Sequence, residues 1–81
     1  MDIIEKLKDG ICQIDATVKK ENIPVDQGLM DSGILDSYGF IEFVAYIEKT
    51  YNIEFQDDEI SNKNFADLNV IAAFIKTKLQ E

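Results

Sequence analysis

The sequence predicts an all-α protein: a small four-helix bundle made of three main helices and one short helix. Three segments carry apolar residues at spacings of three and four, which is the period of one helix face. No pair of segments alternates for long enough to form paired strands. The chain has 81 residues, 46% of them hydrophobic, which is enough for one modest core. We therefore expect a single domain over residues 1–81.

The first helix is expected over roughly residues 2–17. Its apolar stripe repeats at helical spacing in Ile4, Leu7, Ile11, Ile14 and Val18. Gly10 weakens this helix modestly. Cys12 lies beside the stripe, and no basic neighbour is evident that would favour its thiolate. We expect Cys12 to fill packing volume rather than to react.

The segment from Lys19 to Asp36 loses the helical period, and Pro24, Gly28 and Gly33 interrupt it. We expect a long ordered loop here, pinned to the core by scattered apolar side chains: Ile23, Val25, Leu29, Met30, Ile34 and Leu35. Loops of this length are unusual in compact small domains and often have a function.

The second helix is expected to begin at Asp36–Ser37 and to run to about Tyr51. Asn52 is a suitable stop, because asparagine tolerates the left-handed conformation that ends many helices. The next three residues, 53–55, alternate but are too few for a sheet. The buried stripe of this helix is predicted to comprise Phe40, Phe43, Val44 and Ile47.

Two further helical signals follow. The acidic run at 57–60 predicts a cap and one short helical turn, because negative charge suits a helix N-terminus. Asp67 is a good N-cap for the last helix, and Phe65 is placed to staple its start. That helix carries Val70, Ile71, Phe74, Ile75 and Leu79 at helical spacing. The crowded acids of the short turn also predict a stability that depends on salt or divalent cations, particularly around Asp57, Asp58 and Glu59.

The composition excludes several classes of site. One cysteine and no histidine rule out a disulfide framework, zinc sites built from these residues, and Cys–His or Ser–His nucleophile pairs. The chain is also too short for a deep enclosed substrate cavity. We therefore do not expect an enzyme, and we expect no catalytic residue and no resident metal.

The net charge indicates the class of partner. Sixteen acidic residues face eight lysines, which gives a net charge of -8. This charge repels nucleic acid and anionic lipid, so we predict neither nucleic-acid binding nor membrane insertion, whereas a basic docking patch would be attracted. It also discourages self-association and predicts a monomer. The N-terminus has no basic leader or long apolar run, and with the lone cysteine this fits a cytoplasmic protein.

The residues around Ser37 admit two interpretations. In one, Asp36 or Ser37 only caps the following helix, and Gly33 permits a tight turn. In the other, Ser37 is an exposed attachment point, and the positive end of the helix dipole stabilises a phosphodiester placed there. Nothing in the sequence could activate Ser37 as a nucleophile, so another enzyme would have to modify it.

The segment Gly33-Ile34-Leu35-Asp36-Ser37 resembles the phosphopantetheine attachment motif of acyl carrier proteins. The resemblance covers almost the whole chain, because the length, the acidity and the helix order fit as well. The Leu-Asp-Ser-aromatic form, with Phe65-Ala66-Asp67-Leu68-Asn69 leading the last helix, looks closest to D-alanyl carrier proteins and related stand-alone carriers of peptide-synthetase type.

This resemblance implies a cofactor and a set of partners. A phosphopantetheinyl transferase would use coenzyme A and magnesium to attach 4′-phosphopantetheine to Ser37, and Asp36 would help to place the metal and coenzyme A. The terminal thiol would carry an acyl or aminoacyl group as a thioester. A cargo-loading ligase and downstream acyl-transferring enzymes of fatty acid, peptide or polyketide biosynthesis would be the other partners.

The family also docks its partners through the second helix. By position, the resemblance assigns acidic contacts to Glu42 and Glu48, and an adjoining apolar patch to Tyr38, Ile41 and Ala45. In the alternative, the glutamates are ordinary exposed residues of a helix and Ile41 packs inward. Gly39 and Lys49 stand where fatty-acid carriers usually have acids, which favours a dedicated partner set. Gly39 also lowers helix stability by roughly 1 kcal/mol relative to alanine. Its presence indicates that a partner needs a close approach to the backbone here.

Two questions stay open at this stage. A non-catalytic interaction domain with the same fold, never pantetheinylated, would present the same acidic second helix. For a carrier, aromatic side chains would narrow any cleft between the second and third helices and favour a small amino acid or short acyl cargo: Phe40, Phe43, Phe55, Phe65 and Phe74.

Overall fold

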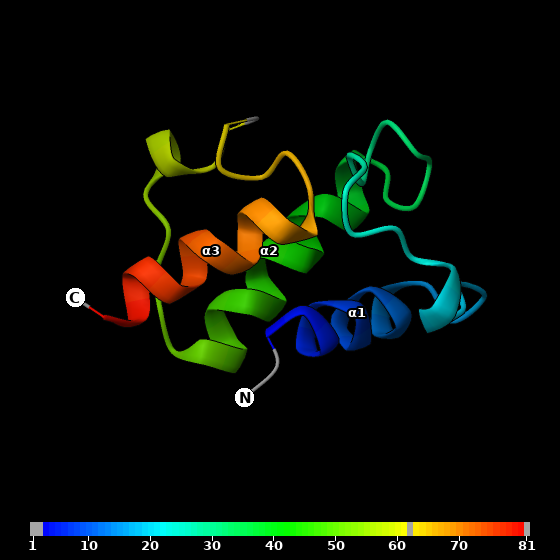
Figure 1. Cartoon of the computed structure of the whole chain (residues 1–81), viewed down its shortest axis with the longest axis horizontal. Helices are drawn as coiled ribbons and strands as arrows, with labels where there is room; N and C mark the ends of the chain where they lie inside the picture. The colour runs from blue at the N-terminus through cyan, green and yellow to red at the C-terminus, as the bar shows by residue number, and fades with distance from the viewer. Residues whose placement is uncertain (1–2, 62, 81) are drawn as a thin grey trace.

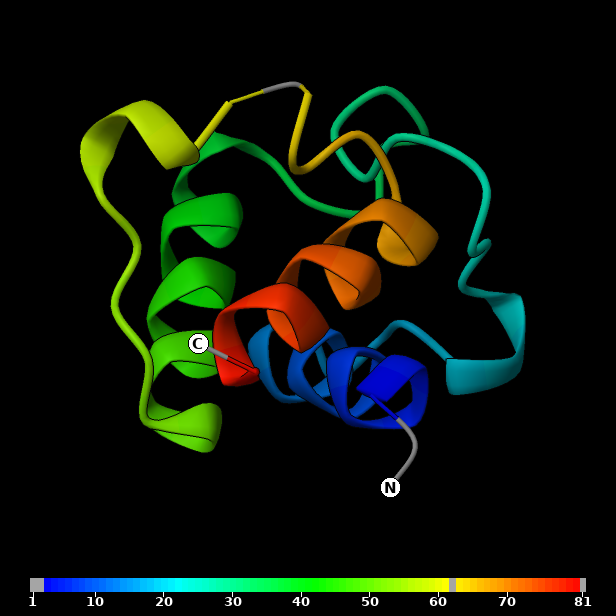
Figure 2. The same ribbon diagram turned by 60° about the vertical axis from the view of Figure 1, so that its left-hand side comes forward.

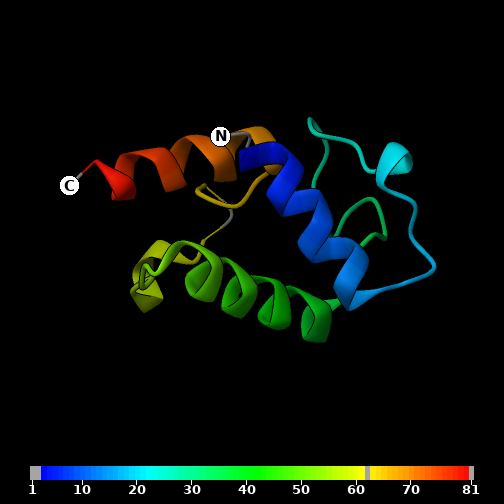
Figure 3. The ribbon, with the colours of Figure 1, turned by 90° about the horizontal axis from the view of Figure 1, so that it is seen from below.

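A computed structural model describes residues 3–61 and 63–80 of the chain (Figure 1). Three α-helices, α1 (Ile3–Ile14), α2 (Ser37–Tyr51) and α3 (Leu68–Leu79), alternate with two 3-10 turns, η1 (Lys20–Asn22) and η2 (Asp57–Glu59). Helix α1 packs against both α2 and α3, and Figure 3 shows it running from α3 towards the start of α2. The described ranges contain no strand, and the predicted all-α fold with three main helices and one short helix is confirmed.

Helix α1 is shorter than the predicted 2–17. It ends at Ile14 because the next residue, Asp15, starts a turn: its carboxylate accepts hydrogen bonds from the Thr17 N–H at 3.0 Å and the Thr17 hydroxyl at 2.6 Å. Short acidic side chains compete with the helix in this way. Residue 2 lies outside the described residues. Val18, assigned to the helical stripe, packs against the core from beyond the helix end.

A close contact joins α1 to α2 at Gly10. A Cβ atom at this position would lie 2.4 Å from ring carbons of Tyr46, a distance that real contacts do not reach. The Tyr46 hydroxyl donates to the carbonyl of Lys6 at 2.9 Å. The glycine that weakens α1 locally is therefore the residue that lets the tyrosine ring of α2 lie flat against it.

The long loop between α1 and α2 is anchored as expected by three buried side chains: Ile23, Leu29 and Leu35. Val25 and Ile34 are partly buried, and the Val25 carbonyl accepts from the Asn69 N–H at 3.2 Å, which ties the loop to α3. Met30 was also expected to be an anchor, but its side chain is 49% exposed. The prediction was wrong because Met30 lies at the tip of a turn that points away from the core.

The 3-10 turn η1 within this loop was not predicted. It is held against α1 by Lys20, whose ammonium pairs with the carboxylates of Glu5 and Asp9, the latter at 2.8 Å. Both acids lie on the exposed side of α1, one helical turn apart, so one lysine bridges them. These two carboxylates raise the pKa of Lys20 above its ordinary value.

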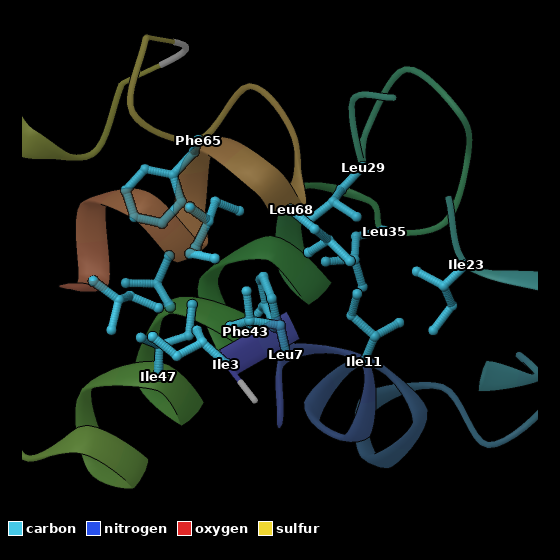
Figure 4. Close-up of a cluster of buried hydrophobic side chains, with 14 of the residues drawn as sticks. Ile3, Leu7, Ile11, Ile23, Leu29, Leu35, Phe43, Ile47, Phe65 and Leu68 are labelled. Atoms are coloured by element: carbon cyan, nitrogen blue, oxygen red, sulfur yellow. The ribbon is translucent and has the colours of Figure 1, made fainter. Parts of the chain in front are cut away.

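The core is made entirely of apolar side chains, and no polar or charged side chain of the described residues is fully buried. Figure 4 shows side chains from all three helices and from the loop meeting in one cluster. Phe43, Val44 and Ile47 of α2 are buried as predicted, whereas Phe40 is only partly covered. In α3, Leu68 and Ala72 join Ile71 and Ile75, while Leu79 at its end is exposed.

The acidic turn η2 is capped by Gln56 rather than by one of its acids. Glu59 accepts from the Gln56 N–H at 2.8 Å and from the Lys78 ammonium at 2.9 and 3.0 Å, and these bonds, the Gln56 bond first, lower the pKa of Glu59 below its ordinary 4.5. The Lys78 ammonium lies 5.5 Å from the ring centroids of Phe55 and Phe74. Lys78 therefore relieves the expected crowding of acids at Glu59.

Candidate functional site

Asp36 and Ser37 form the start of α2. Asp36 has extended backbone, and its Oδ1 accepts a hydrogen bond from the Gly39 N–H at 2.7 Å, so Asp36 is the N-cap. Ser37 is the first helical residue, and its side chain is exposed. The capping interpretation is therefore correct for Asp36. It leaves the Ser37 hydroxyl free for the attachment interpretation, because Ser37 is not the cap.

The preceding loop holds this start in place. Gly33 adopts φ +82°, a left-handed conformation that glycine allows at no steric cost, and its N–H donates to the Met30 carbonyl at 3.2 Å. The Leu35 N–H then donates to the Leu29 carbonyl at 3.1 Å, while both side chains are buried. Two anchors thus fix the loop directly before Ser37.

Exposed apolar side chains follow Ser37 on α2. Tyr38 is 73% exposed and Ile41 is 67% exposed, although both are large apolar residues on a helix that otherwise covers the core. Ala45 and Glu42 are exposed on the same helix, and Met30 adds a further apolar side chain from the loop. Four of the residues predicted to dock partners therefore share a solvent-facing surface on α2.

Glu48, the fifth predicted docking residue, differs from these four. It is half-buried, and its Oε2 accepts a hydrogen bond from the Phe55 N–H at 2.8 Å. Its carboxylate therefore holds the segment after α2 against the helix. The role of Glu48 in docking stays a prediction. The sequence gave no sign of its hydrogen bond to Phe55, because the two residues are seven positions apart.

Gly39 has an explanation inside the molecule. It is buried, and a Cβ atom there would lie 3.2 Å from Oδ1 of Asp36, 3.3 Å from Leu35 and 3.6 Å from Ile14. The space that glycine leaves open is therefore filled by the chain's own loop, cap and α1. The inference that a partner approaches the backbone at Gly39 was wrong, because the α-carbon faces inward.

The predicted aromatic cluster forms beside the start of α2. The Phe65 ring makes edge-to-face contacts with Phe40 at 5.6 Å and Phe55 at 5.3 Å, and Phe55 stacks on Phe74 at 5.6 Å. Such pairs stabilise beyond the area they bury. Phe43 does not belong to this cluster; it is fully buried between the main helices. Phe65, expected to staple α3, contacts that helix through the Phe74 ring, with 6.3 Å between the ring centroids.

A surface pocket of about 370 Å³ lies over Phe40 and Phe65. We call it the loop pocket. Its walls include Leu29, Met30 and Asp31 from the loop, Phe40 from α2, and Ser61 and Phe65 from the segment after η2. Asp31 begins the sequence segment that leads to Ser37, but sequence reasoning gave no role to it or to Ser61, since only the folded chain brings these two segments together.

These groups fit a covalently attached phosphodiester. The first N–H groups of a helix lack intrahelical partners, and the helix dipole is positive at that end, so a phosphodiester on Ser37 is favourably placed. The chain contains no histidine, and the described residues include no group of three potential ligands that could hold a metal ion. Cys12 is half-buried with its thiol directed to the Val18 carbonyl at 3.4 Å. None of the described helices is both long and apolar enough to cross a membrane.

Comparison with known proteins gives two findings. The family described as phosphopantetheine attachment site matches residues 5–75. The solution NMR structure of a holo acyl carrier protein from Nitrosomonas europaea is similar in fold, with a TM-score of 0.82, 23% sequence identity and full coverage of both chains. No curated protein matches the sequence.

Proposed function

Because the chain belongs to the acyl carrier protein family, with a phosphopantetheine attachment domain over most of its length, we propose that Ser37 bears the arm. Members of this family are carriers rather than enzymes, and their cofactor is a covalently attached 4′-phosphopantetheine. The observation that supports Ser37 is its position: an exposed hydroxyl at the first turn of α2, next to a residue that already caps the helix. We take residues 1–81 as one carrier domain.

Attachment is a phosphoryl transfer from coenzyme A. The Ser37 oxygen bonds to the phosphorus of the pantetheine end, the pyrophosphate bond breaks, and the adenosine bisphosphate leaves. The hydroxyl proton goes to a base of the transferase, because the chain has no histidine and Asp36 is engaged as a cap. One oxygen of Asp36 accepts from Gly39, and we assign the other to the transferase's magnesium.

Once attached, the arm supplies a thiol that holds an acyl or aminoacyl group as a thioester. Partners then load, modify and unload this cargo: a phosphopantetheinyl transferase first, then a loading ligase and acyl-transferring enzymes. We infer a small amino acid or short acyl cargo of the kind carried by D-alanyl or peptidyl carriers, because packed phenylalanine rings fill the space beside α2.

We propose that partners dock on Tyr38, Ile41, Glu42 and Ala45, and that a basic rim on the partner meets Glu42. This proposal is supported by exposed apolar side chains flanked by an acid, on a chain with a net charge of -8. Glu48 contributes less, since its carboxylate already bonds to Phe55. The same charge supports a monomer, and the lone cysteine supports a cytoplasmic location.

Intact-protein mass tests the proposal. Wild type, Ser37→Ala and Ser32→Ala are incubated with coenzyme A, magnesium and a broad-specificity phosphopantetheinyl transferase. Ser32 is the matched control, because it is the other serine of the same loop and only bonds locally to the Leu29 carbonyl. We expect one phosphopantetheinyl group on wild type and on Ser32→Ala, and none on Ser37→Ala.

The same experiment separates the carrier from a non-catalytic interaction domain. If folded wild type gains no mass, the chain is not a substrate of the transferase, and the exposed surface of α2 would then serve binding alone. A gain that persists in Ser37→Ala would move the attachment site to another residue.

A further inference from the structure

The loop pocket lies within reach of Ser37. Phe40 in its floor follows Ser37 by one helical turn, and the Leu35–Leu29 hydrogen bond keeps the pocket-lining loop against the start of α2. Figure 2 shows the loop and the segment after η2 side by side above α2 and α3. A flexible arm attached to Ser37 can fold back and place its tip here.

The floor of the loop pocket is apolar and shallow. Phe40 and Phe65 meet edge to face below it, and behind them Phe65 contacts Phe55 and Phe74 in a continuous cluster. A long alkyl chain would have to displace these rings to enter the core. The packed rings below the pocket therefore favour a group that stays near the surface.

The wall of the loop pocket carries one carboxylate, that of Asp31. This side chain turns back over Gly28, with Oδ2 3.1 Å from the place where a Cβ of Gly28 would be. Within residues 3–61 and 63–80, no hydrogen bond or ion pair engages it. Among the described residues that line the wall, the other polar side chain is the Ser61 hydroxyl. Asp31 is exposed, so its carboxylate is available to pair with a cation placed in the pocket, whereas a neutral acyl group offers it no partner.

We propose that the loop pocket receives the cargo and selects a small aminoacyl group, whose ammonium pairs with Asp31 while its side chain covers Phe40 and Phe65. An aminoacyl thioester has this ammonium at neutral pH, and a plain acyl thioester does not. The proposal rests on the carrier function and narrows its cargo from acyl or aminoacyl to aminoacyl.

The test compares two cargoes that differ only in the ammonium. Synthetic coenzyme A analogues carrying alanyl or propionyl, joined through a stable amide in place of the thioester, are attached to the protein by the transferase. Intact mass first verifies the attachment. Backbone amide NMR shifts and thermal unfolding are then recorded for each form. We expect alanyl, but not propionyl, to shift amides at 29–31, 40 and 61, and to raise the Tm by about 2–4 °C.

Substitution assigns the effect to one carboxylate. Asp31→Asn should remove the difference between the two cargoes, whereas Asp26→Asn, an exposed acid of the same loop outside the pocket, should keep it. Equal shifts from both cargoes, or an unchanged difference in Asp31→Asn, overturn the proposal while the measured attachment keeps the carrier function intact. A failure of attachment would instead refute the carrier function.

Discussion

The carboxylate of Asp36 accepts from the Gly39 N–H, so its structural role and its proposed role towards the transferase can be separated by substitution. Asparagine caps helices about as well as aspartate, but it has no charge to offer a metal. Alanine loses both properties. The two variants therefore differ in stability while they share the loss of charge.

We predict that Asp36→Ala lowers the free energy of unfolding by about 1 kcal/mol, the usual effect of losing an N-cap, with a fall in Tm of roughly 4–8 °C. Asp36→Asn should stay close to wild type in a thermal melt. Both should be pantetheinylated more slowly, by roughly tenfold or more, as expected when a metal-positioning partner is lost. Wild-type kinetics in Asp36→Asn would show that the residue serves only as a cap.

At the scale of elements, the contact between α1 and α2 depends on the missing side chain at Gly10. Alanine there gains about 1 kcal/mol of helix propensity. The same methyl would have to displace the Tyr46 ring and its bond to the Lys6 carbonyl, and overpacking of this kind costs about 1–3 kcal/mol.

We predict that Gly10→Ala destabilises the wild-type chain, by about 1 kcal/mol net, but stabilises a Tyr46→Ala chain, because the propensity gain is then unopposed. Urea unfolding of the four proteins of this double-mutant cycle checks the sign change. Stabilisation by Gly10→Ala in both backgrounds would mean that the ring moves aside freely.

The bond between η2 and α3 gives a prediction in acid. The pKa of Glu59 is lowered by its bonds to the Gln56 N–H and to Lys78, so the folded state holds its proton less tightly than the unfolded state. The resulting stabilisation is fully present above the ordinary, unfolded pKa of 4.5 and is lost as the pH falls through the lower folded value.

We therefore expect Glu59→Gln to flatten the decline in unfolding midpoint between about pH 5 and pH 3. Asp58→Asn removes a charge from the same turn and should keep the wild-type slope. Parallel curves for wild type and Glu59→Gln would show that these bonds do not persist in solution.

The sequence predicts an element best when the interactions that define the element join residues close together in the chain. The limits of α2 follow from Asp36 at one end and Asn52, with φ 54°, at the other, and both act within one helical turn. The shorter α1 depends on one side chain bonding two residues ahead, which a periodicity cannot register. Gly10 is needed because Tyr46 packs onto it, and Gly39 because Leu35 does. From the sequence alone, each glycine indicates only a lower helix propensity.

The candidate site divides in the same way. Ser37 and Asp36 are contiguous in a motif, and so their placement could be predicted. The loop pocket joins Asp31 to Ser61 across thirty residues, and Glu48 bonds to a backbone group beyond the helix end. The exposure of Met30 was not predicted. In the sequence, this apolar residue lies between Ile23 and Leu35 beside the buried Leu29, and it resembles another anchor of the loop.

Across the whole molecule, sixteen acids outnumber eight lysines, and the excess negative charges repel one another on a small surface. Screening this repulsion should stabilise the folded state. We predict that the Tm rises between about 10 mM and about 200 mM sodium chloride. Because the described residues offer no cluster of three acidic ligands, magnesium chloride at matched ionic strength should give the same rise.

A larger rise with magnesium would reveal a specific cation site, and no rise with either salt would show that repulsion among the excess acids does not limit the stability. Ion pairs between described residues already offset part of the acidic charge: Lys20–Glu5, Lys20–Asp9 and Lys78–Glu59.

The core consists of apolar side chains, so the residues that stabilise the fold are different from those proposed to bind partners. No described residue with a polar side chain is fully buried, and no side-chain hydrogen bond among the described residues involves Tyr38, Glu42 or their exposed apolar neighbours on α2. The four exposed docking residues of α2 can be replaced together: Tyr38, Ile41, Glu42 and Ala45. The buried face of the same helix, formed by Phe43, Val44 and Ile47, would stay unchanged. The scaffold is thus suited to retargeting: a different enzyme's recognition surface can be grafted onto α2, and the hybrid should melt within a few degrees of its parent.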